Sequence, residues 1–160
     1  MKWRTIIDQV QALRGGHAMT KQSTKQSSEL TEANVRSGWD EYFLNIAMVV
    51  ASRSTCPRAS VGAVIVRDKR IVATGYNGAP SGEPHCTEVG CLMVDGHCQR
   101  VLHAETNAIA QAARFGIAVQ GATLYYWDSL NRSRSCTKCA QLTAAAGLTR
   151  IVTTAEQVGK

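Results

Sequence analysis

The chain has 160 residues, 44% of them hydrophobic, which is the length of one globular domain and enough apolar material for a core without disulfides. Its formal charge of +6 favours anionic partners such as nucleotides, but no dense basic run or aromatic ladder marks a nucleic-acid groove. No stretch approaches the roughly 20 apolar residues that cross a bilayer, and the first residues do not resemble a secretory signal. We therefore expect a cytoplasmic protein with no membrane partner.

Residues 1–38 are expected to form a flexible polar leader, with the folded domain at 39–160. Residues 15–38 are rich in Gly, Ser, Thr, Gln and Lys, so they cannot bury enough apolar surface to offset the entropy of ordering. Before them, apolar residues recur at near-helical spacing: Trp3, Ile6, Ile7, Val10 and Leu13. This spacing leaves open a short amphipathic helix and, as the simpler reading, a partly ordered tail.

From Trp39 the sequence predicts a helix and then a strand hairpin. The helix lies in WDEYFLNIAMVVASRS, and its expected apolar stripe consists of Tyr42, Ile46, Val49 and Val50. The strands lie at 61–66 and 70–76, because both segments are rich in β-branched residues and only three polar residues separate them. Residues 77–101 are rich in Gly, Pro and Cys, a composition that favours neither helix nor strand. The number of cysteines indicates a loop with a function and not a simple connection.

The rest of the chain predicts two more helices and two more strands. A helix in HAETNAIAQAARFG (103–116) has Ala108, Ile109 and Ala112 at core spacing and Gly116 at its end. A strand at 122–127, a helix at 136–147 stopped by Gly147, and a strand at 149–154 follow. This alternation predicts an α/β domain in which helices cover a sheet.

Two predicted helices begin at potential metal ligands. His103 and Glu105 open the first, and Cys136 and Cys139 open the second, so both ends can meet at one sheet edge. A Cys-x-x-Cys pair alone fits either a metal or a redox dithiol, but the positive helix end favours the thiolate form that zinc requires. With His103, the two cysteines make three ligands and leave a fourth zinc position for water, as in catalytic sites.

Such a site points to hydrolysis. Zinc lowers the pKa of a bound water toward ~7, and a carboxylate that is not a ligand can then move the proton of that water. Glu105, two residues from His103, is placed for this role, whereas an ordinary first-turn helix carboxylate is the structural alternative. His-x-Glu followed by Cys-x-x-Cys is the signature of zinc deaminases.

The combined motifs resemble the zinc-dependent cytidine and deoxycytidylate deaminases over about residues 39–153. The runs HAETNAIA, CTKC, VGAVIV and RIVATGYNGAPSG carry this resemblance, and GYNG with HCTEVGC and HCQRVLHAE is most similar to the deoxycytidylate (dCMP) branch. The resemblance implies a three-layer α/β/α fold with a central mixed sheet. It also implies zinc ligands at His103, Cys136 and Cys139, a proton shuttle at Glu105, a homo-oligomer that is often a hexamer, and dCTP activation with dTTP inhibition in some members.

Candidate substrate contacts follow in part from the same resemblance. Asn77 matches a residue that contacts the substrate sugar, although Asn-Gly is also a strong turn signal. Ala104, beside the ligand His103, is a further candidate. Tyr125, Tyr126 and Trp127 lie where one aromatic can stack on the base, and Tyr126 is the candidate, although strand aromatics mostly lie in cores. The loop arginines Arg132 and Arg134 are candidates for a substrate phosphate, with solvated loop charges as the alternative.

The other cysteines suggest a second zinc. Cys56, Cys86, Cys91 and Cys98 offer four soft ligands in a loop-rich region, with His85 as an alternative ligand, and a closed zinc site would order such a loop. Some relatives carry a second zinc, and Cys56 and Cys86 match two of its ligands. Reduced free thiols are the alternative.

The sequence predicts a zinc hydrolase that converts dCMP to dUMP and ammonia in support of thymidylate synthesis. Relatives usually have proline directly before the first cysteine of the pair, whereas this chain has Ser135 after a longer approach, DSLNRSRS. The altered loop bears on substrate size. It leaves open the same chemistry on a nucleoside, a modified cytidylate or a nucleic-acid base, and also a catalytically silent, zinc-stabilised nucleotide-binding module.

Overall fold

A computed structural model describes residues 36–132 and 135–154 of the chain. All of these except Arg36 belong to one compact unit that begins at Ser37. The expected leader up to residue 35 and the loop residue Arg134 lie outside the described residues, so the predicted domain boundary stays a prediction. In this part of the chain no helix is long and apolar enough to cross a membrane.

A mixed four-stranded sheet in the order β2-β1-β5-β6 forms the middle layer. β1 (Val61–Arg67) and β2 (Arg70–Tyr76) form the predicted antiparallel hairpin. β5 (Thr123–Asp128) pairs antiparallel with β1, and β6 (Arg150–Thr153) pairs parallel with β5. The sheet is therefore mixed, as the family resemblance implied.

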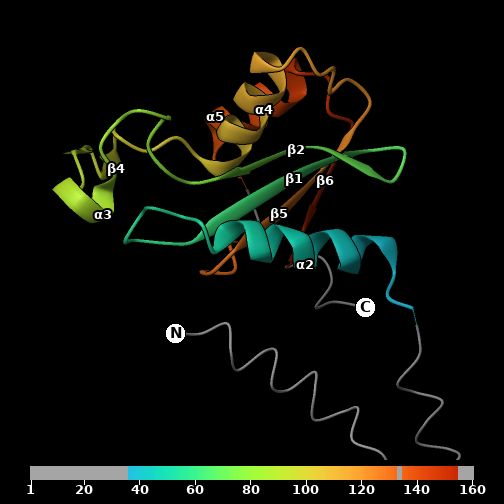
Figure 1. Cartoon of the computed structure of the whole chain (residues 1–160), viewed down its shortest axis with the longest axis horizontal. Coiled ribbons are helices and arrows are strands. Elements are labelled where there is room, and N and C mark those ends of the chain that lie inside the picture. Colours follow the sequence, from blue (N-terminus) through green and yellow to red (C-terminus); the bar gives the residue numbers. More distant parts are fainter. Residues whose placement is uncertain (1–35, 133–134, 155–160) are drawn as a thin grey trace, which may run out of the picture. The chain divides into compact units, whose positions relative to one another are not determined.

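Helices cover both faces of the sheet and make the predicted α/β/α layers (Figure 1). α2 (Trp39–Ala51) lies on one face, whereas α4 (Ala104–Arg114) and α5 (Thr137–Ala145) lie on the other. Six successive residues of β1 are buried because both of its faces are covered. A strand of this kind reads as a continuous apolar run, which explains the sequence VGAVIV.

The buried face of α2 differs from the predicted stripe. The fully buried residues are Phe43, Leu44, Ala47 and Ala51. Of the predicted stripe, Ile46 and Val50 are partly buried against the core, whereas Tyr42 is 46% exposed and Val49 is 63% exposed. The cause is the close approach of α2 to Gly62 in β1, where an added Cβ would collide with the backbone of Ala47 and Ala51. Small side chains must face such a contact, so the helix turns its alanines inward.

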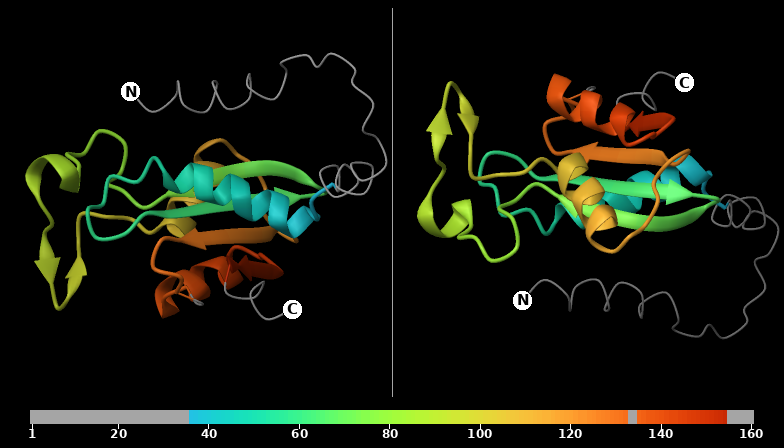
Figure 2. Two further views of the ribbon diagram at one scale, coloured as in Figure 1. Left: turned by 90° about the horizontal axis from the view of Figure 1, so that it is seen from below. Right: turned by 90° about the horizontal axis from the view of Figure 1, so that it is seen from above.

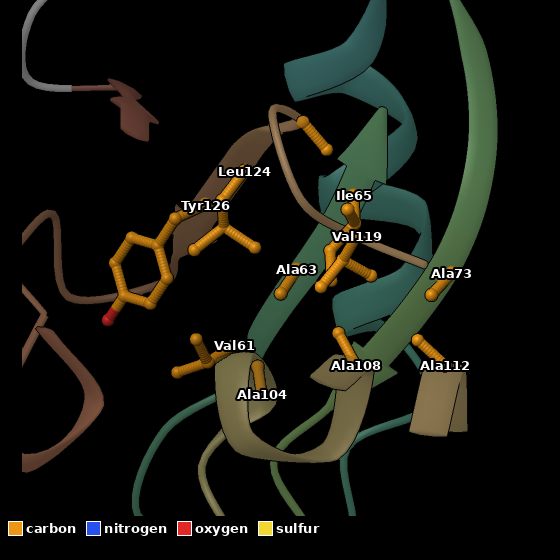
Figure 3. Close-up of a cluster of buried hydrophobic side chains, with 11 residues drawn as sticks. Val61, Ala63, Ile65, Ala73, Ala104, Ala108, Ala112, Val119, Leu124 and Tyr126 are labelled. Atoms are coloured by element: carbon orange, nitrogen blue, oxygen red, sulfur yellow. The ribbon is translucent and has the colours of Figure 1, made fainter. Parts of the chain in front are cut away.

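α4, the helix that carries His103 and Glu105 at its start, approaches the sheet in the same way. Its buried side chains Ala104, Ala108 and Ala112 pack in a cluster with residues of β1, β2 and β5 (Figure 3). Gly75 in β2 lies opposite this helix, and a Cβ at Gly75 would collide with the α4 backbone at Ala104 and Ala108. The glycine therefore sets the distance between α4 and the sheet.

We expect G75A to lower the free energy of unfolding by about 3 kcal/mol, the upper range for overpacking, because backbone rather than a flexible side chain blocks the new methyl group. Urea unfolding followed by circular dichroism measures the change. G38A is the control for steric collision, since no atom lies within 4 Å of a Cβ at Gly38; as the N-cap of α2 it should lose at most about 1 kcal/mol. Equal unfolding midpoints for the two variants would contradict the close packing of α4.

The Cys-rich segment contains regular structure that we did not predict. α3 (Cys86–Val89), β3 (Met93–Val94) and β4 (His97–Cys98) are short, and β3 pairs antiparallel with β4. These elements lie together beyond one end of the four-stranded sheet (Figure 2). The turn of the small hairpin is Asp95-Gly96, both at positive φ, and Asp-Gly is a strong hairpin signal that is present in the sequence.

Candidate metal centre and active site

The amino-terminal ends of α4 and α5 bring the two predicted motifs together. His103 and Cys136 are the N-cap residues of these helices, and each has an extended backbone. Just before His103, Leu102 exchanges two backbone hydrogen bonds with Gly78, which fixes the entry to α4. As predicted, segments that are more than thirty residues apart meet at one point.

The three predicted metal-ligand atoms form a compact set. Nδ1 of His103 lies 3.4 Å from Sγ of Cys136 and 3.3 Å from Sγ of Cys139. All three atoms lie within 4.8 Å of one another. A tetrahedral zinc with bonds of roughly 2.0–2.3 Å holds its ligands roughly 3.5 Å apart, and one imidazole with two thiolates is a typical zinc donor set. The residues present therefore fit a zinc ion.

Cys139 shows why this site needs a cation. The side chain is only 3% exposed, and burial, followed by the nearby negative charge of Glu105, raises the pKa of its thiol to about 12. Metal binding must therefore displace a proton from Cys139. The effect of the positive end of α5 on the thiolate stays a prediction.

Glu105 is a buried carboxylate in the wall of the same site. It lies in the first turn of α4, only 2% of it is exposed, and it lines one cavity with His103 and Cys136. Oε1 of Glu105 accepts a 2.6 Å hydrogen bond from the hydroxyl of Ser135. Glutamate is almost never this buried without a paired charge or a function, which favours a chemical role over that of a helix-end carboxylate.

The cavity has a volume of about 410 Å³, within the range of small-molecule sites. Of the predicted substrate contacts, Asn77, Ala104, Tyr126 and Arg132 line it, and Arg134 lies outside the described residues. Arg58 and His97 also line the cavity, and neither was predicted. They come from the loop before β1 and from β4, and no motif in the sequence connects these segments to the metal ligands.

Asp128 is a further residue that sequence reasoning missed. Its carboxylate is 1% exposed and accepts hydrogen bonds from the Tyr126 hydroxyl at 3.1 Å, from the Leu130 amide at 2.9 Å and from Nε of Arg132. Burial, followed by the charges of Glu105 and Asp128, raises the pKa of Tyr126, so its phenol stays a donor. Alternation along β5 places residues 126 and 128 on one face, and this signal was available in the sequence.

Asn77 has a structural role at the cavity wall. Its Nδ2 donates to the Ala59 carbonyl at 2.8 Å, and its Oδ1 accepts from the Val61 amide at 2.9 Å. The residue is not in a hairpin turn, because β2 ends at Tyr76 and Gly78 already pairs with Leu102. The side chain thus fixes the start of β1, and contact with a substrate sugar stays a prediction.

Three of the four other cysteines form a second cluster. The thiols of Cys86, Cys91 and Cys98 lie within 4.8 Å of one another, and the sulfurs of Cys86 and Cys98 are 3.6 Å apart. Cys56 is not in this group and lines the cavity instead. His85, the alternative ligand, has a buried Nδ1 with no hydrogen-bond partner among the described residues.

Comparison with known proteins identifies this arrangement. The sequence model described as the cytidine and deoxycytidylate deaminase zinc-binding region matches residues 37–155. The chain belongs to the cytidine and deoxycytidylate deaminase family. Its zinc cofactor follows from this zinc-binding domain and from the His103, Cys136 and Cys139 cluster.

Deaminases are also among its most similar relatives. The chain is 47% identical over 113 residues to ComE operon protein 2 of Bacillus subtilis, a match that covers 71% of this chain and 57% of that protein. It is 40% identical over 128 residues to the deoxycytidylate deaminase of Mycobacterium phage D29, a match that covers 73% of this chain and 94% of the phage protein. The chain thus spans little more than half of the bacterial protein and nearly all of the phage enzyme.

A solved deaminase structure has the same fold. The dCMP deaminase of the cyanophage S-TIM5, in complex with dCMP and dUMP, has a TM-score of 0.62 and 28% identity, with 78% of this chain and 90% of that chain covered. This overlap confirms the predicted deaminase fold.

Proposed function

We propose that this deaminase hydrolyses dCMP to dUMP and ammonia and so supports thymidylate supply. One observation carries the proposal: the buried carboxylate of Glu105 lines one cavity of about 410 Å³ with His103 and Cys136, and Cys139 completes their ligand set. Similarity to the phage D29 deoxycytidylate deaminase and to a dCMP deaminase structure holding dCMP and dUMP supports the choice of substrate.

The proposed reaction is dCMP plus water to dUMP plus ammonia. Zinc held by His103, Cys136 and Cys139 would supply an activated water at neutral pH. Glu105 takes one proton from this water and delivers it to N3 of the pyrimidine ring as the water oxygen bonds to C4. It then takes the remaining proton from the new C4 hydroxyl and gives it to the amino group, which leaves as ammonia as the C4 carbonyl forms. Because Glu105 is 2% exposed, these transfers are sheltered from bulk water, which strengthens the electrostatic interactions within the site.

We assign the substrate phosphate to Arg132, with Asp128 holding it. Arg132 lines the cavity, and its Nε donates to the buried Asp128 carboxylate, which leaves the terminal nitrogens of the guanidinium available. A guanidinium held in this way is pre-organised for a phosphate, because its planar fork binds two oxygens at once.

R132Q is expected to raise the KM for dCMP about 10- to 100-fold and to leave the KM for deoxycytidine within about twofold. The range follows from the roughly 1.5–3 kcal/mol of a hydrogen bond to a charged group. Steady-state ammonia release on both substrates measures the difference. R53Q is the control, because Arg53 is exposed and does not line the cavity. An equal change for both substrates would contradict a phosphate contact.

The function itself is tested by incubating zinc-loaded protein with dCMP, dCTP, deoxycytidine and cytidine and measuring ammonia. We expect dCMP to have the highest kcat/KM. Preference for a nucleoside would move the assignment to another cytidine-type substrate. Zinc-loaded protein that releases no ammonia from any of the four would support the nucleotide-binding module instead.

We also propose that the second cysteine cluster holds a structural zinc. Cys86, Cys91 and Cys98 supply three thiol ligands whose sulfurs lie within 4.8 Å of one another, a donor set that suits a closed zinc site. Neither Cys56, the predicted fourth ligand, nor the alternative His85 belongs to the group of ligand atoms within 4.8 Å of one another, so three ligands carry the proposal and these two are the candidates for the fourth.

Elemental analysis is expected to find two zinc ions per chain in freshly purified protein and one in C91S. Cys91 is suited to this test because it belongs to the second cluster and does not line the active-site cavity. Protein with a single zinc that C91S leaves unchanged would favour free thiols.

Regulation and assembly follow from the same resemblance. We propose dCTP and dTTP as effectors and a homo-oligomer, in the family's pattern a hexamer, working in the cytoplasm. A second cavity, of about 580 Å³, supports an effector site, because it offers Tyr76, His85 and Arg114 for a base and phosphates. Adding dCTP or dTTP to the dCMP assay tests the effectors, and light scattering tests the assembly.

A further inference from the structure

Ser135 makes a contact that the reaction described above does not explain. Its hydroxyl donates a 2.6 Å hydrogen bond to Oε1 of Glu105, a residue 30 positions away in the chain. Ser135 is half-buried and directly precedes Cys136, the N-cap of α5. Within the described part of the chain, this is the one hydrogen bond to the Glu105 carboxylate.

Two other hydrogen-bond donors of the cavity already donate to Asp128. The Tyr126 hydroxyl lines the same cavity but donates to Asp128, and Nε of Arg132 also donates to Asp128. A carboxylate as buried as Glu105 loses solvation by water, so a single hydroxyl donor has a large influence on where its oxygens lie. The terminal torsion of glutamate has no single narrow minimum, so the Ser135 hydroxyl selects one orientation of the carboxylate.

We propose that Ser135 is a positioning residue for Glu105: its hydroxyl holds Oε1, so that Oε2 is the oxygen that exchanges protons with the substrate. This inference rests on the proposed deaminase function. It also assigns a role to the altered loop, because Ser135, the residue before Cys136, donates a hydrogen bond to Glu105. Misplacing a reacting group by about 1 Å costs on the order of 100-fold in rate, so one hydroxyl can control kcat from outside the reacting atoms.

Fixing Glu105 acts on proton transfer and not on ground-state binding. S135A should therefore lower kcat for dCMP about 10- to 100-fold and change KM less than twofold. S135T keeps a hydroxyl at the same position and should recover most of the lost kcat. S129A is the matched control, because the Ser129 hydroxyl in the same loop accepts from the Ser60 amide and does not contact Glu105.

Two measurements separate positioning from a general structural role. The first is the affinity for a 2-pyrimidinone deoxynucleotide, whose hydrate resembles the tetrahedral stage of the reaction. S135A should weaken its binding about 10- to 100-fold and leave dUMP binding unchanged. The second is a crystal structure of S135A, in which the Glu105 carboxylate should be rotated from its wild-type position while zinc content stays the same.

An S135A variant with wild-type kcat and analogue affinity would overturn the inference, and so would equal losses of affinity for the analogue and for dUMP. Failure of the proposed function looks different. In that case the zinc-loaded wild type itself releases no ammonia from dCMP and does not bind the analogue. That result would also overturn the positioning role of Ser135.

Discussion

Replacing Glu105 with glutamine is expected to lower kcat for dCMP about 10⁴-fold, the upper range for general acid–base catalysis, and to leave zinc content unchanged. Glutamine has nearly the same shape as glutamate, so the packing of this 2% exposed side chain is retained. Its amide cannot accept and return a proton, which removes the transfer to the pyrimidine ring and to the leaving amine. Single-turnover ammonia release, with elemental analysis of the same sample, measures both quantities.

E41Q provides the matched control for this variant. Glu41 also lies in the first turn of a helix, α2, but it is exposed and does not line the cavity. We expect E41Q to keep wild-type activity. An active E105Q variant would refute the proton-transfer role and return Glu105 to the alternative of a helix-end carboxylate.

Replacing Cys139 with serine is expected to remove zinc from the first site and to abolish dCMP turnover. A serine hydroxyl is a poor zinc ligand, and two remaining ligands, His103 and Cys136, do not complete a catalytic set. Zinc affinity should fall by more than about 100-fold, the loss that changes in outer-shell partners alone can cause. Competition with a chelator measures the affinity.

C91S is the informative comparison, because it removes a thiol from the other cluster. Both variants should lose one zinc per chain, whereas C139S alone should lose the metal next to Glu105 and its activity. A C139S protein that retains two zinc ions and wild-type kcat would contradict the assignment of the catalytic ligands.

The sequence predicted the layers of the fold because its signals there are local. β1 is a continuous apolar run, and Gly116 and Gly147 follow α4 and α5 at positive φ, where helices end. The buried face of α2 was predicted only in part, at Ile46 and Val50, because close approach at Gly62 selects alanines over larger side chains. That contact joins α2 to a strand, and no pattern within the helix reveals it.

The functional site shows the same difference between local sequence signals and contacts between distant segments. His-x-Glu and Cys-x-x-Cys carry their chemistry within a few residues, so the compact ligand cluster could be anticipated. The Ser135 contact with Glu105 and the wall residues Arg58 and His97 depend on how distant segments meet, and the sequence held no trace of them. Asp128 lies between these cases, since strand alternation placed it beside Tyr126 without showing what it would bind.

The strand order has a consequence for how the protein is made. β1 pairs with β2 on one side and with β5 on the other, but β5 begins 123 − 67 = 56 residues after β1 ends. At about 5–20 residues per second, a ribosome needs roughly 3 to 11 s to synthesise that interval. For this time the second edge of VGAVIV has no partner from its own sheet, and an unpaired apolar edge is a template for aggregation. The strand at the centre of the finished sheet is therefore the segment that most needs protection on the nascent chain.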